Sequence, residues 1–262
     1  MPDAPSAGTA RRIGRRLLRA ILAAAAIIGA WQLATVLLAL PPYILPPPSR
    51  VGAAFLTHGE FLLRNAGVTA LEIVLGLAAG AVLGIVTSLA ISGLPAAGRV
   101  VLPVMVASQA LPVFAIAPLL VIWLGYGIAS KVVMATLIIY FPVASAFLDG
   151  LRRTDPGLLD LAAISGAGRL RTLALIRIPA ALPGLASGLR VAAAVAPIGA
   201  VVGEWVGASA GLGFVMLQAN ARMQTDMVFA ALLMLGGMAV LIRAAVDAAT
   251  RRLVHWIDET PL

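Results

Sequence analysis

The chain has no cysteine, a single lysine and only two histidines. Without cysteine there can be no disulfide, iron–sulfur cluster, thiolate zinc site or cysteine nucleophile. Lys131 is not preceded by the GxxxxGK pattern, so the chain has no phosphate-binding loop of its own for ATP. His58 and His255 lie far apart in the sequence and neither belongs to an HExxH pattern, which argues against a metal site.

Charge is too scarce for an ordinary soluble domain. Charged residues make up 11% of the 262 residues, whereas about a quarter is usual in soluble proteins. Hydrophobic residues make up 61%, so the chain cannot cover a water-facing surface and is predicted to be an integral membrane protein. Its long apolar runs lack the alternation of barrel strands, which predicts an all-α membrane fold.

About six apolar runs reach the roughly 20 residues that a transmembrane helix needs. In the third run, Pro103, Pro112 and Pro118 predict a kinked helix. In the second run, glycines spaced by four residues share one helix face, which predicts close packing against a neighbouring helix. We expect transmembrane helices at residues 17–40, 66–91, 100–124, 128–148, 182–206 and 227–246.

The basic residues are unequally divided between the two sides of the membrane. If the chain crosses the membrane six times, 14 of the 19 Lys and Arg residues lie on the same side as both termini. By the positive-inside rule, residues 1–16 and 251–262 are therefore expected in the cytoplasm. The apolar run after Arg19 is too long for a cleaved signal peptide, so we expect it to be retained. The net charge of +8 orients the helices and does not indicate a nucleic-acid partner.

Two segments of the chain differ from the apolar runs. Residues 41–50, PPYILPPPSR, are predicted to be a non-helical outer connector, because their prolines lack amide donors. A short amphipathic stretch at 51–63 is expected to follow, so that 41–65 form an outer segment. Residues 66–250 are expected to form the transmembrane core, which is interrupted by a cytoplasmic loop at 149–180.

This loop carries five Arg and three Asp within residues 149–179 and has helix signals. Asp155 and Pro156 are typical of an N-cap and a first helical position, and Gly166 and Gly168 predict a stop and a sharp turn. A second short helix is expected at 169–178, ending at Pro179. Two such helices in an L on the membrane surface suit docking of a partner. The alternative is an ordinary interfacial pair with Arg at the lipid headgroups.

From Asp160 the loop reads DLAAISGAGRLRTLALIRIP. This resembles the EAA motif of ABC importer permeases, which is Glu-Ala-Ala, three residues, Gly, nine residues, Ile, one residue and Leu-Pro. Every spacing matches, with departures at Asp160 for Glu, Leu161 for Ala and Ile178 for Leu. Segments at 45–51, 108–127, 140–156 and 182–205 also resemble permeases of the nitrate, sulfonate and taurine importer group.

The resemblance implies a type I ABC importer permease in the bacterial inner membrane. Two permease copies, expected to be identical, would assemble with two ABC ATPase subunits, and an extracytoplasmic binding protein would deliver the substrate. The chain would bind no cofactor, because ATP and Mg²⁺ belong to the ATPase. The loop would be a coupling helix that converts ATPase closure into a tilt of the transmembrane helices. The expected coupling residues are Asp160, Leu161, Ala162, Gly166, Ala167, Gly168, Ile176 and Pro179.

The resemblance also bears on the substrate. Sulfonate-type relatives carry Arg where this chain has Gln109, and they also tend to carry Arg near the position of Glu72. A neutral amide and an acid in place of these cations disfavour an anionic substrate here. Segments 108–127 and 217–233 resemble the branch assigned to the pyrimidine precursor of thiamine, hydroxymethylpyrimidine or its formylated amino relative. Sulfonate, taurine, nitrate and riboflavin are the alternatives.

Polar side chains inside the apolar runs are candidates for the substrate pathway, because intramembrane charges are costly and often functional. These candidates are Glu72, Gln109, Arg190 and Glu204. Glu72 and Glu204 are expected near the outer ends of their helices, where water can reach them. For Arg190 a structural ion pair is the alternative.

Two other classes of function were considered. A secondary transporter driven by an ion gradient would need midplane ionisable groups and usually an internal repeat, and no convincing repeat is present. An intramembrane enzyme would need membrane carboxylates with a His or Ser partner, and none can be nominated. The sequence therefore predicts a permease without catalytic residues of its own.

Overall fold

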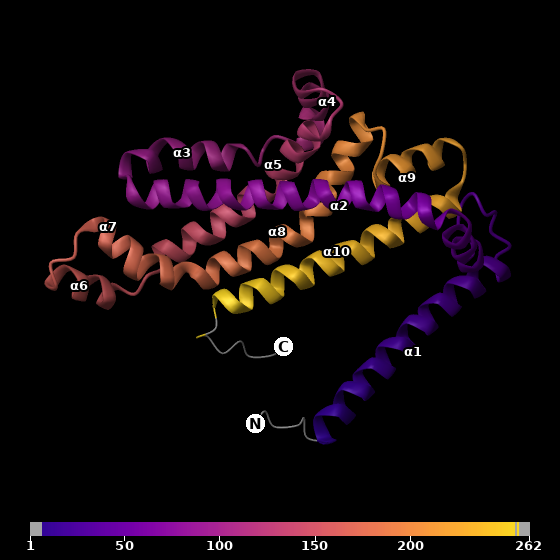
Figure 1. The fold of residues 1–262 in the computed structure, drawn as a ribbon, viewed down its shortest axis with the longest axis horizontal. Coiled ribbons are helices and arrows are strands. Elements are labelled where there is room, and N and C mark those ends of the chain that lie inside the picture. The colour runs from indigo at the N-terminus through magenta and orange to yellow at the C-terminus, as the bar shows by residue number, and fades with distance from the viewer. Residues whose placement is uncertain (1–6, 255, 257–262) are drawn as a thin grey trace. The chain divides into compact units, whose positions relative to one another are not determined.

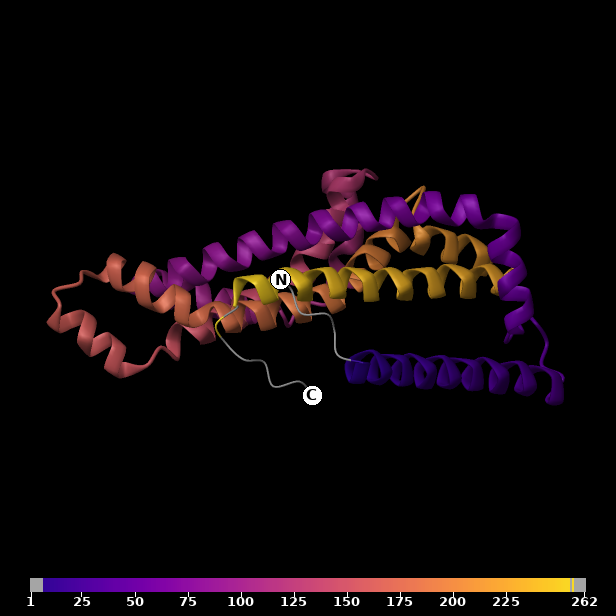
Figure 2. The same ribbon diagram turned by 60° about the horizontal axis from the view of Figure 1, so that its bottom comes forward.

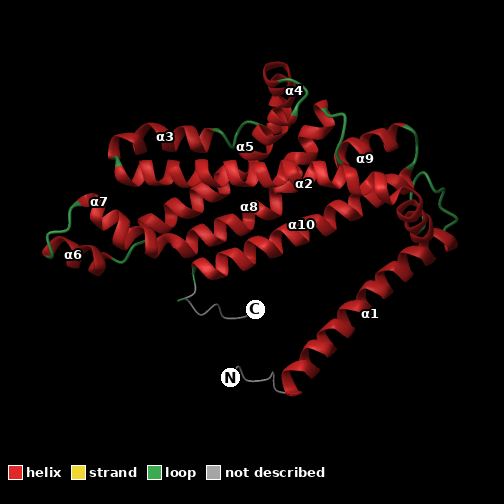
Figure 3. Ribbon diagram, in the orientation of Figure 1, coloured by secondary structure: helices red, strands yellow, loops and turns green. Residues whose placement is uncertain are grey.

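The computed structural model describes residues 7–254 and 256, and within these residues the chain is helical, without strands (Figure 3). Residues 1–6 of the expected N-terminal segment 1–16 lie outside the described part. So do residues 255 and 257–262 of the expected tail 251–262, which include His255. The chain divides into two compact units. Unit 1 comprises Met1–Gly59 and Gln218–Ala230, and unit 2 comprises Glu60–Leu217 and Ala231–Leu262.

Unit 1 contains α1 (Ala7–Leu37), the proline-rich connector and the first turns of α2 (Pro48–Gly93) and α10 (Thr225–Leu253). The rings of Trp31 and Phe229 are in contact, with centroids 5.5 Å apart. The connector is non-helical as far as Pro47, as predicted, but α2 begins at Pro48, inside the segment expected to be non-helical. Proline is well suited to the first helical turn, because the amide it lacks would have no partner there.

The second transmembrane helix is longer than predicted. α2 includes both the amphipathic stretch expected at 51–63 and the span expected at 66–91. His58 alone has non-helical dihedral angles (φ −118°, ψ 18°), which marks a kink. The two predicted elements are therefore parts of one kinked helix.

The core of unit 2 is built on α5 (Ile128–Arg152) and α8 (Ile178–Gly207), which pack closely along their length (Figure 1). Small residues permit this approach and that of α2. A Cβ added to Gly80 of α2 would lie 2.6 Å from Cγ2 of Ile139, and one added to Gly76 would overlap Ala135. The predicted glycine face is thus confirmed as a packing surface. Buried core residues include Ile73, Ala135, Ile139, Val143, Phe147, Leu185, Ala192, Ala196 and Ala200.

The expectation of one kinked helix at 100–124 is wrong. The structure has two helices there, α3 (Pro95–Ala107) and α4 (Val113–Leu124), with a non-helical segment at 108–112. Pro112 adopts an extended conformation (ψ 114°), and a proline also disfavours helical dihedral angles in the residue before it. Pro103 and Pro118 lie inside α3 and α4, so only one of the three prolines breaks the span.

Four helical segments in the described part of the chain are long and apolar enough to cross a membrane: α2, α5, α10 and the continuous run Arg169–Gly207. α3 and α4 are shorter apolar helices. The predicted all-α membrane fold is confirmed. Of the six predicted spans, the third is a pair of short helices.

Candidate functional site

The loop predicted at 149–180 contains a short helix with well-formed ends, α6 (Pro156–Ile164). Its N-cap is Asp155, whose carboxylate accepts the amide of Gly157 at 2.7 Å. At the other end Gly166 has a φ of +68°, and the amide of Ala167 donates to the carbonyl of Ala162 at 2.9 Å. This is the bonding pattern that commonly ends a helix at a glycine. The predicted start and stop of α6 are therefore confirmed.

The second loop helix differs from the prediction. α7 (Arg169–Thr172) passes into a π-helical turn, η1 (Leu173–Arg177), and then directly into α8. Pro179 therefore does not end the helix, because it lies in the first turn of α8 after the wider π turn. The loop is consequently joined to the fifth span by continuous helix, which is a stiffer connection than a turn.

One face of α6 is apolar and exposed. Leu158, Leu161 and Ile164 recur every three residues and share one side of the helix, and Leu161 and Ile164 are 60% and 85% exposed. Figures 1 and 2 both show α6 and α7 projecting beyond the ends of α5 and α8. Exposed apolar side chains on a projecting, polar segment are typical of a surface that contacts another protein.

The expected coupling residues do not all share this surface. Asp160, Leu161, Gly166 and Gly168 are exposed, whereas Ala162 is buried and Ala167 is half-buried. Ile176 and Pro179 are half-buried on the run that leads into α8. The structure therefore separates an exposed group on and after α6 from a group that connects the loop to the core.

A second polar region is buried inside unit 2, and we call it the buried polar cluster. It comprises Asn65, Thr69 and Glu72 of α2, Lys131 of α5 and Glu204 of α8. The Glu204 carboxylate is 1% exposed. Its Oε1 accepts the Thr69 hydroxyl at 2.6 Å. Its Oε2 accepts the amides of Gly213 and Phe214.

These contacts cap a helix that the sequence reading missed, α9 (Leu212–Ala221). The amide of Leu212 donates to Oγ1 of Thr69, and the amide of Gly211 donates to Oδ1 of Asn65, both at 2.8 Å. Four successive amides at 211–214 thus have side-chain acceptors. A helix N-terminus has unpaired amides and partial positive charge, so the Glu204 carboxylate is well placed there.

Lys131 makes the complementary interaction at a helix C-terminus. Its ammonium group donates to the carbonyls of Tyr126 at 2.6 Å, Gly127 at 3.1 Å and Gly207. Gly207 is the last residue of α8, where carbonyls lack partners and partial charge is negative. Glu72 is 3% exposed and lies close enough to Lys131 and Glu204 to interact with both charges.

The four predicted pathway residues therefore lie in three different places. Glu72 and Glu204 come together in the buried polar cluster, so the expectation that water reaches them is wrong. Arg190 lies elsewhere, and its Nε is 2.9 Å from Oδ1 of Asp247 on α10, the structural ion pair considered as the alternative. Gln109 is exposed in the break between α3 and α4.

The role of Lys131 is not predicted from the sequence, in which it is one of the five basic residues outside the cytoplasmic group of 14. The signal available was its isolation: it is the only lysine, and it lies in an apolar run. Among the described residues, no group of three or more His, Cys, Asp or Glu side chains could hold a metal ion.

A helical fold with several membrane-length segments and a stiff, apolar-faced loop defines the membrane subunit of a larger assembly. The chain belongs to the family of binding-protein-dependent transport system inner membrane components, which matches residues 76–259. The resemblance drawn from the EAA-type motif is thereby confirmed for the family.

Three relatives agree with this assignment. The chain is 50% identical over 239 residues to a probable ABC transporter permease protein of Haemophilus influenzae, covering 91% of this chain and 98% of that protein. It is 36% identical over 216 residues to the formylaminopyrimidine transport permease protein ThiX of Halalkalibacterium halodurans, covering 82% and 86%. It is 29% identical over 254 residues to the taurine transport system permease protein TauC of Escherichia coli, covering 94% and 92%.

The chain is thus a multi-pass inner-membrane permease subunit of an ABC importer. Such a subunit is not itself an enzyme. Membership of the family implies ABC ATPase subunits and a binding protein as partners.

Proposed function

We propose that this permease imports a pyrimidine precursor of thiamine such as hydroxymethylpyrimidine, and that the loop at 149–180 couples transport to ATP hydrolysis. ATP and Mg²⁺ would be bound by the partner ATPase. Both termini would be cytoplasmic, as the distribution of Lys and Arg indicates. The observation that carries the coupling role is the exposed apolar face of Leu158, Leu161 and Ile164 on a short helix that is capped at both ends.

The continuity of the loop with α8 supports the mechanical part of this proposal. Movement of α6 in an ATPase groove would reach α7 across the short turn at 165–168, and from α7 it would pass through η1 into α8 along continuous helix. α8 packs along α5, so a displacement at the loop would tilt the core pair as a rigid body. The residues of the EAA-type motif would then have two tasks, with Asp160 and Leu161 contacting the ATPase and Ile176 and Pro179 transmitting the motion.

The coupling role can be tested with the complete transporter in vesicles. Asp160→Arg and Gly166→Trp place a charge or a bulky ring in the proposed contact, outside the bilayer. Both variants are expected to insert normally and to hydrolyse ATP without accumulating substrate. Arg64→Glu is the matched control, because this exposed side chain on α2 pairs only with Glu60 in the described structure. Normal uptake by both loop variants would contradict the assignment.

The break at 108–112 supports a second permease copy. Non-helical backbone at membrane depth is tolerated where protein or a water-filled path covers it. Here Gln109 and Leu111 are exposed. We therefore propose that two identical permeases face each other across a pathway that the two Gln109 side chains line. Because the chain has no cysteine, a bismaleimide long enough to span the pathway should cross-link a Gln109→Cys variant into a homodimer in membranes, whereas exposed Leu56→Cys should stay monomeric.

Gln109 also supports the proposed substrate. It is the predicted pathway residue that is exposed, whereas Glu72 and Glu204 interact within the core and Arg190 pairs with Asp247. A neutral amide suits a neutral or weakly basic heterocycle better than an anion. The relative named as a formylaminopyrimidine transport permease points the same way.

The substrate can be tested by competition in the same vesicles. Uptake of labelled hydroxymethylpyrimidine, in the presence of the partner binding protein, should be inhibited by unlabelled formylaminopyrimidine and unaffected by taurine. Efficient taurine uptake with no pyrimidine uptake would favour the sulfonate group instead. Uptake without any ATPase subunit would indicate an ion-gradient mechanism.

A further inference from the structure

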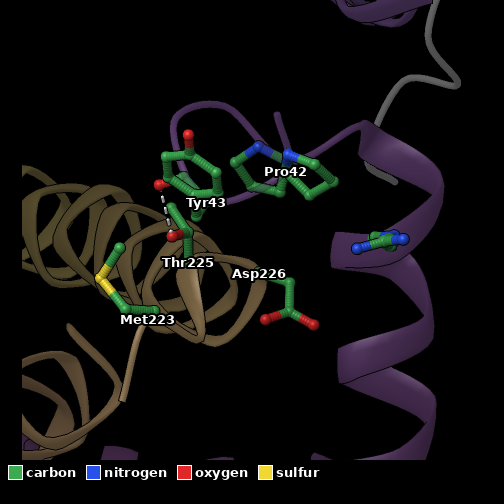
Figure 4. A pocket seen from close by; sticks show the side chains of 7 residues that line it. Pro42, Tyr43, Met223, Thr225 and Asp226 are labelled. Atoms are coloured by element: carbon green, nitrogen blue, oxygen red, sulfur yellow. Dashed lines mark hydrogen bonds between the residues drawn. The ribbon is translucent and has the colours of Figure 1, made fainter. Parts of the chain in front are cut away.

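Unit 1 contains a polar pocket that none of the preceding functions uses (Figure 4). It has a volume of about 350 Å³ and lies between the proline-rich connector and the start of α10. Its lining includes Tyr43, Arg50, Met223, Thr225 and Asp226. A second hollow of about 320 Å³ is also lined by Arg50 and Asp226 and reaches His58 on α2. The two hollows therefore form one polar depression around Arg50 and Asp226.

The walls of this depression are fixed by the chain itself. Pro42 and Pro46 restrict the connector, because the proline ring fixes φ. The Thr225 hydroxyl donates to the carbonyl of Tyr43 at 2.9 Å and ties the connector to the first turn of α10 (Figure 4). The pocket is therefore formed before any partner arrives, which lowers the entropic cost of binding.

The side chains around the depression are those that protein interfaces favour. Tyr43 and Met223 are largely exposed, and aromatic residues, methionine and arginine are enriched where proteins meet. Within the described part of the chain, neither Arg50 nor Asp226 forms an ion pair. The pocket thus offers one cation and one anion, both available to complementary charges on another molecule.

We propose that this depression is a docking point for the extracytoplasmic binding protein. It would accept a protruding loop that places an acidic side chain against Arg50 and a basic side chain against Asp226. The partner follows from the family, whose members work with a binding protein. The side of the membrane follows from the six predicted crossings, which put the connector and the turn before α10 on the side opposite both termini. The inference rests on the proposed orientation and function.

The absence of cysteine makes this proposal directly testable by single-cysteine cross-linking. The complete transporter is reconstituted in nanodiscs and mixed with its purified binding protein. Tyr43→Cys carries a photoreactive maleimide. Leu56→Cys is the matched control, because Leu56 is 90% exposed near the start of α2 but does not line the depression.

Tyr43→Cys should cross-link to the binding protein at least about tenfold more than Leu56→Cys, as expected for a specific contact with complementary charges. Adding Arg50→Glu or Asp226→Arg should lower this yield toward the control, whereas Arg50→Lys should retain it. A binding-protein loop with its two charges reversed should restore cross-linking to an Arg50→Glu, Asp226→Arg double variant.

Equal yields at the two positions would overturn the docking inference, provided that the binding protein stimulates ATP hydrolysis by the same preparation. Protection of the Tyr43→Cys thiol by free hydroxymethylpyrimidine, and not by the binding protein, would also overturn it and assign the pocket to a solute. If the binding protein failed to stimulate the unmodified transporter, the proposed function itself would fail, and the two failures are thus distinguishable.

Discussion

The proposed coupling loop at 149–180 and the buried polar cluster both depart from the usual distribution of side chains, in opposite directions. In the loop, apolar Leu161 and Ile164 are exposed, whereas in the cluster, charged Lys131 and Glu204 are 1% exposed. Both oxygens of Glu204 accept hydrogen bonds, and the Lys131 ammonium donates to three carbonyls. Glu204 and Lys131 thus find their partners within one chain, although Oε2 of the buried Glu72 has no hydrogen-bond partner in the described structure. The apolar loop surface would instead be covered by the proposed partner. Buried charge therefore marks internal architecture here, and the exposed apolar surface is the proposed partner site.

The largest expected effect of a substitution is at the centre of the cluster. Glu204→Leu leaves Lys131, the Thr69 hydroxyl and two amides of α9 without their acceptor or counter-charge. The free energy of unfolding should fall by about 3–5 kcal/mol, the usual cost of removing one partner from a buried charged network. Thermal unfolding of the purified permease in detergent measures this change.

Glu60→Ala is the control for this substitution. Glu60 is an exposed acid on α2 with a single ion pair to Arg64, worth about 0–1 kcal/mol. Equal losses of stability in Glu204→Leu and Glu60→Ala would mean that the cluster does not stabilise the core.

A smaller loss of stability is expected from a substitution in the turn before α9. Gly211 has a φ of +111°, and an added Cβ would overlap the Glu204 carboxyl group. Gly211→Ala combines backbone strain with this overlap and should cost about 2–4 kcal/mol. Gly125 provides the comparison, because its φ is +80° but nothing lies within 4 Å of an added Cβ. Gly125→Ala should carry the backbone cost alone, about 1–3 kcal/mol, because its φ of +80° and ψ of 178° are readily adopted only by glycine. A cost at Gly211 no greater than that at Gly125 would place Glu204 elsewhere.

The smallest effect on the protein as a whole is expected in the loop. Asp155→Ala removes the N-cap of α6 and should destabilise that helix by about 1 kcal/mol. Hydrogen exchange of the α6 amides should accelerate about fivefold, with no change in global unfolding. Asp149→Ala, at an exposed position near the end of α5, is the control. Global destabilisation by Asp155→Ala would show that α6 is an integral part of the core.

The features of the fold that are local in sequence were predictable. The transmembrane helices follow from long apolar runs, and the ends of α6 follow from Asp155, Pro156 and Gly166, because each signal acts within one turn of helix. The break at 108–112 was not predicted, because three prolines in one run look alike. Pro103 and Pro118 are accommodated inside helices, and whether a proline breaks a helix depends on its neighbours in space.

The buried polar cluster could not be predicted, because its contacts join distant parts of the sequence. Asn65 and Gly211 are 146 residues apart, and Lys131 and Gly207 are 76 apart. α9 has only ten residues, too few to register as a transmembrane helix. The one available signal was the presence of a single lysine and two acids, Glu72 and Glu204, in otherwise apolar runs, which predicts a buried group of opposite charges.

The central claim, that the exposed face of α6 is the ATPase-binding surface, is tested most directly by the reactivity of a thiol at its most exposed position. Ile164 is 85% exposed, so Ile164→Cys in the isolated permease should react rapidly with a maleimide in detergent. Adding the ATPase subunits should slow this reaction at least about tenfold, because a docked interface excludes solvent. Tyr43→Cys should react equally fast with and without the ATPase. An unchanged rate at Ile164→Cys, in a complex shown to be assembled, would contradict the account.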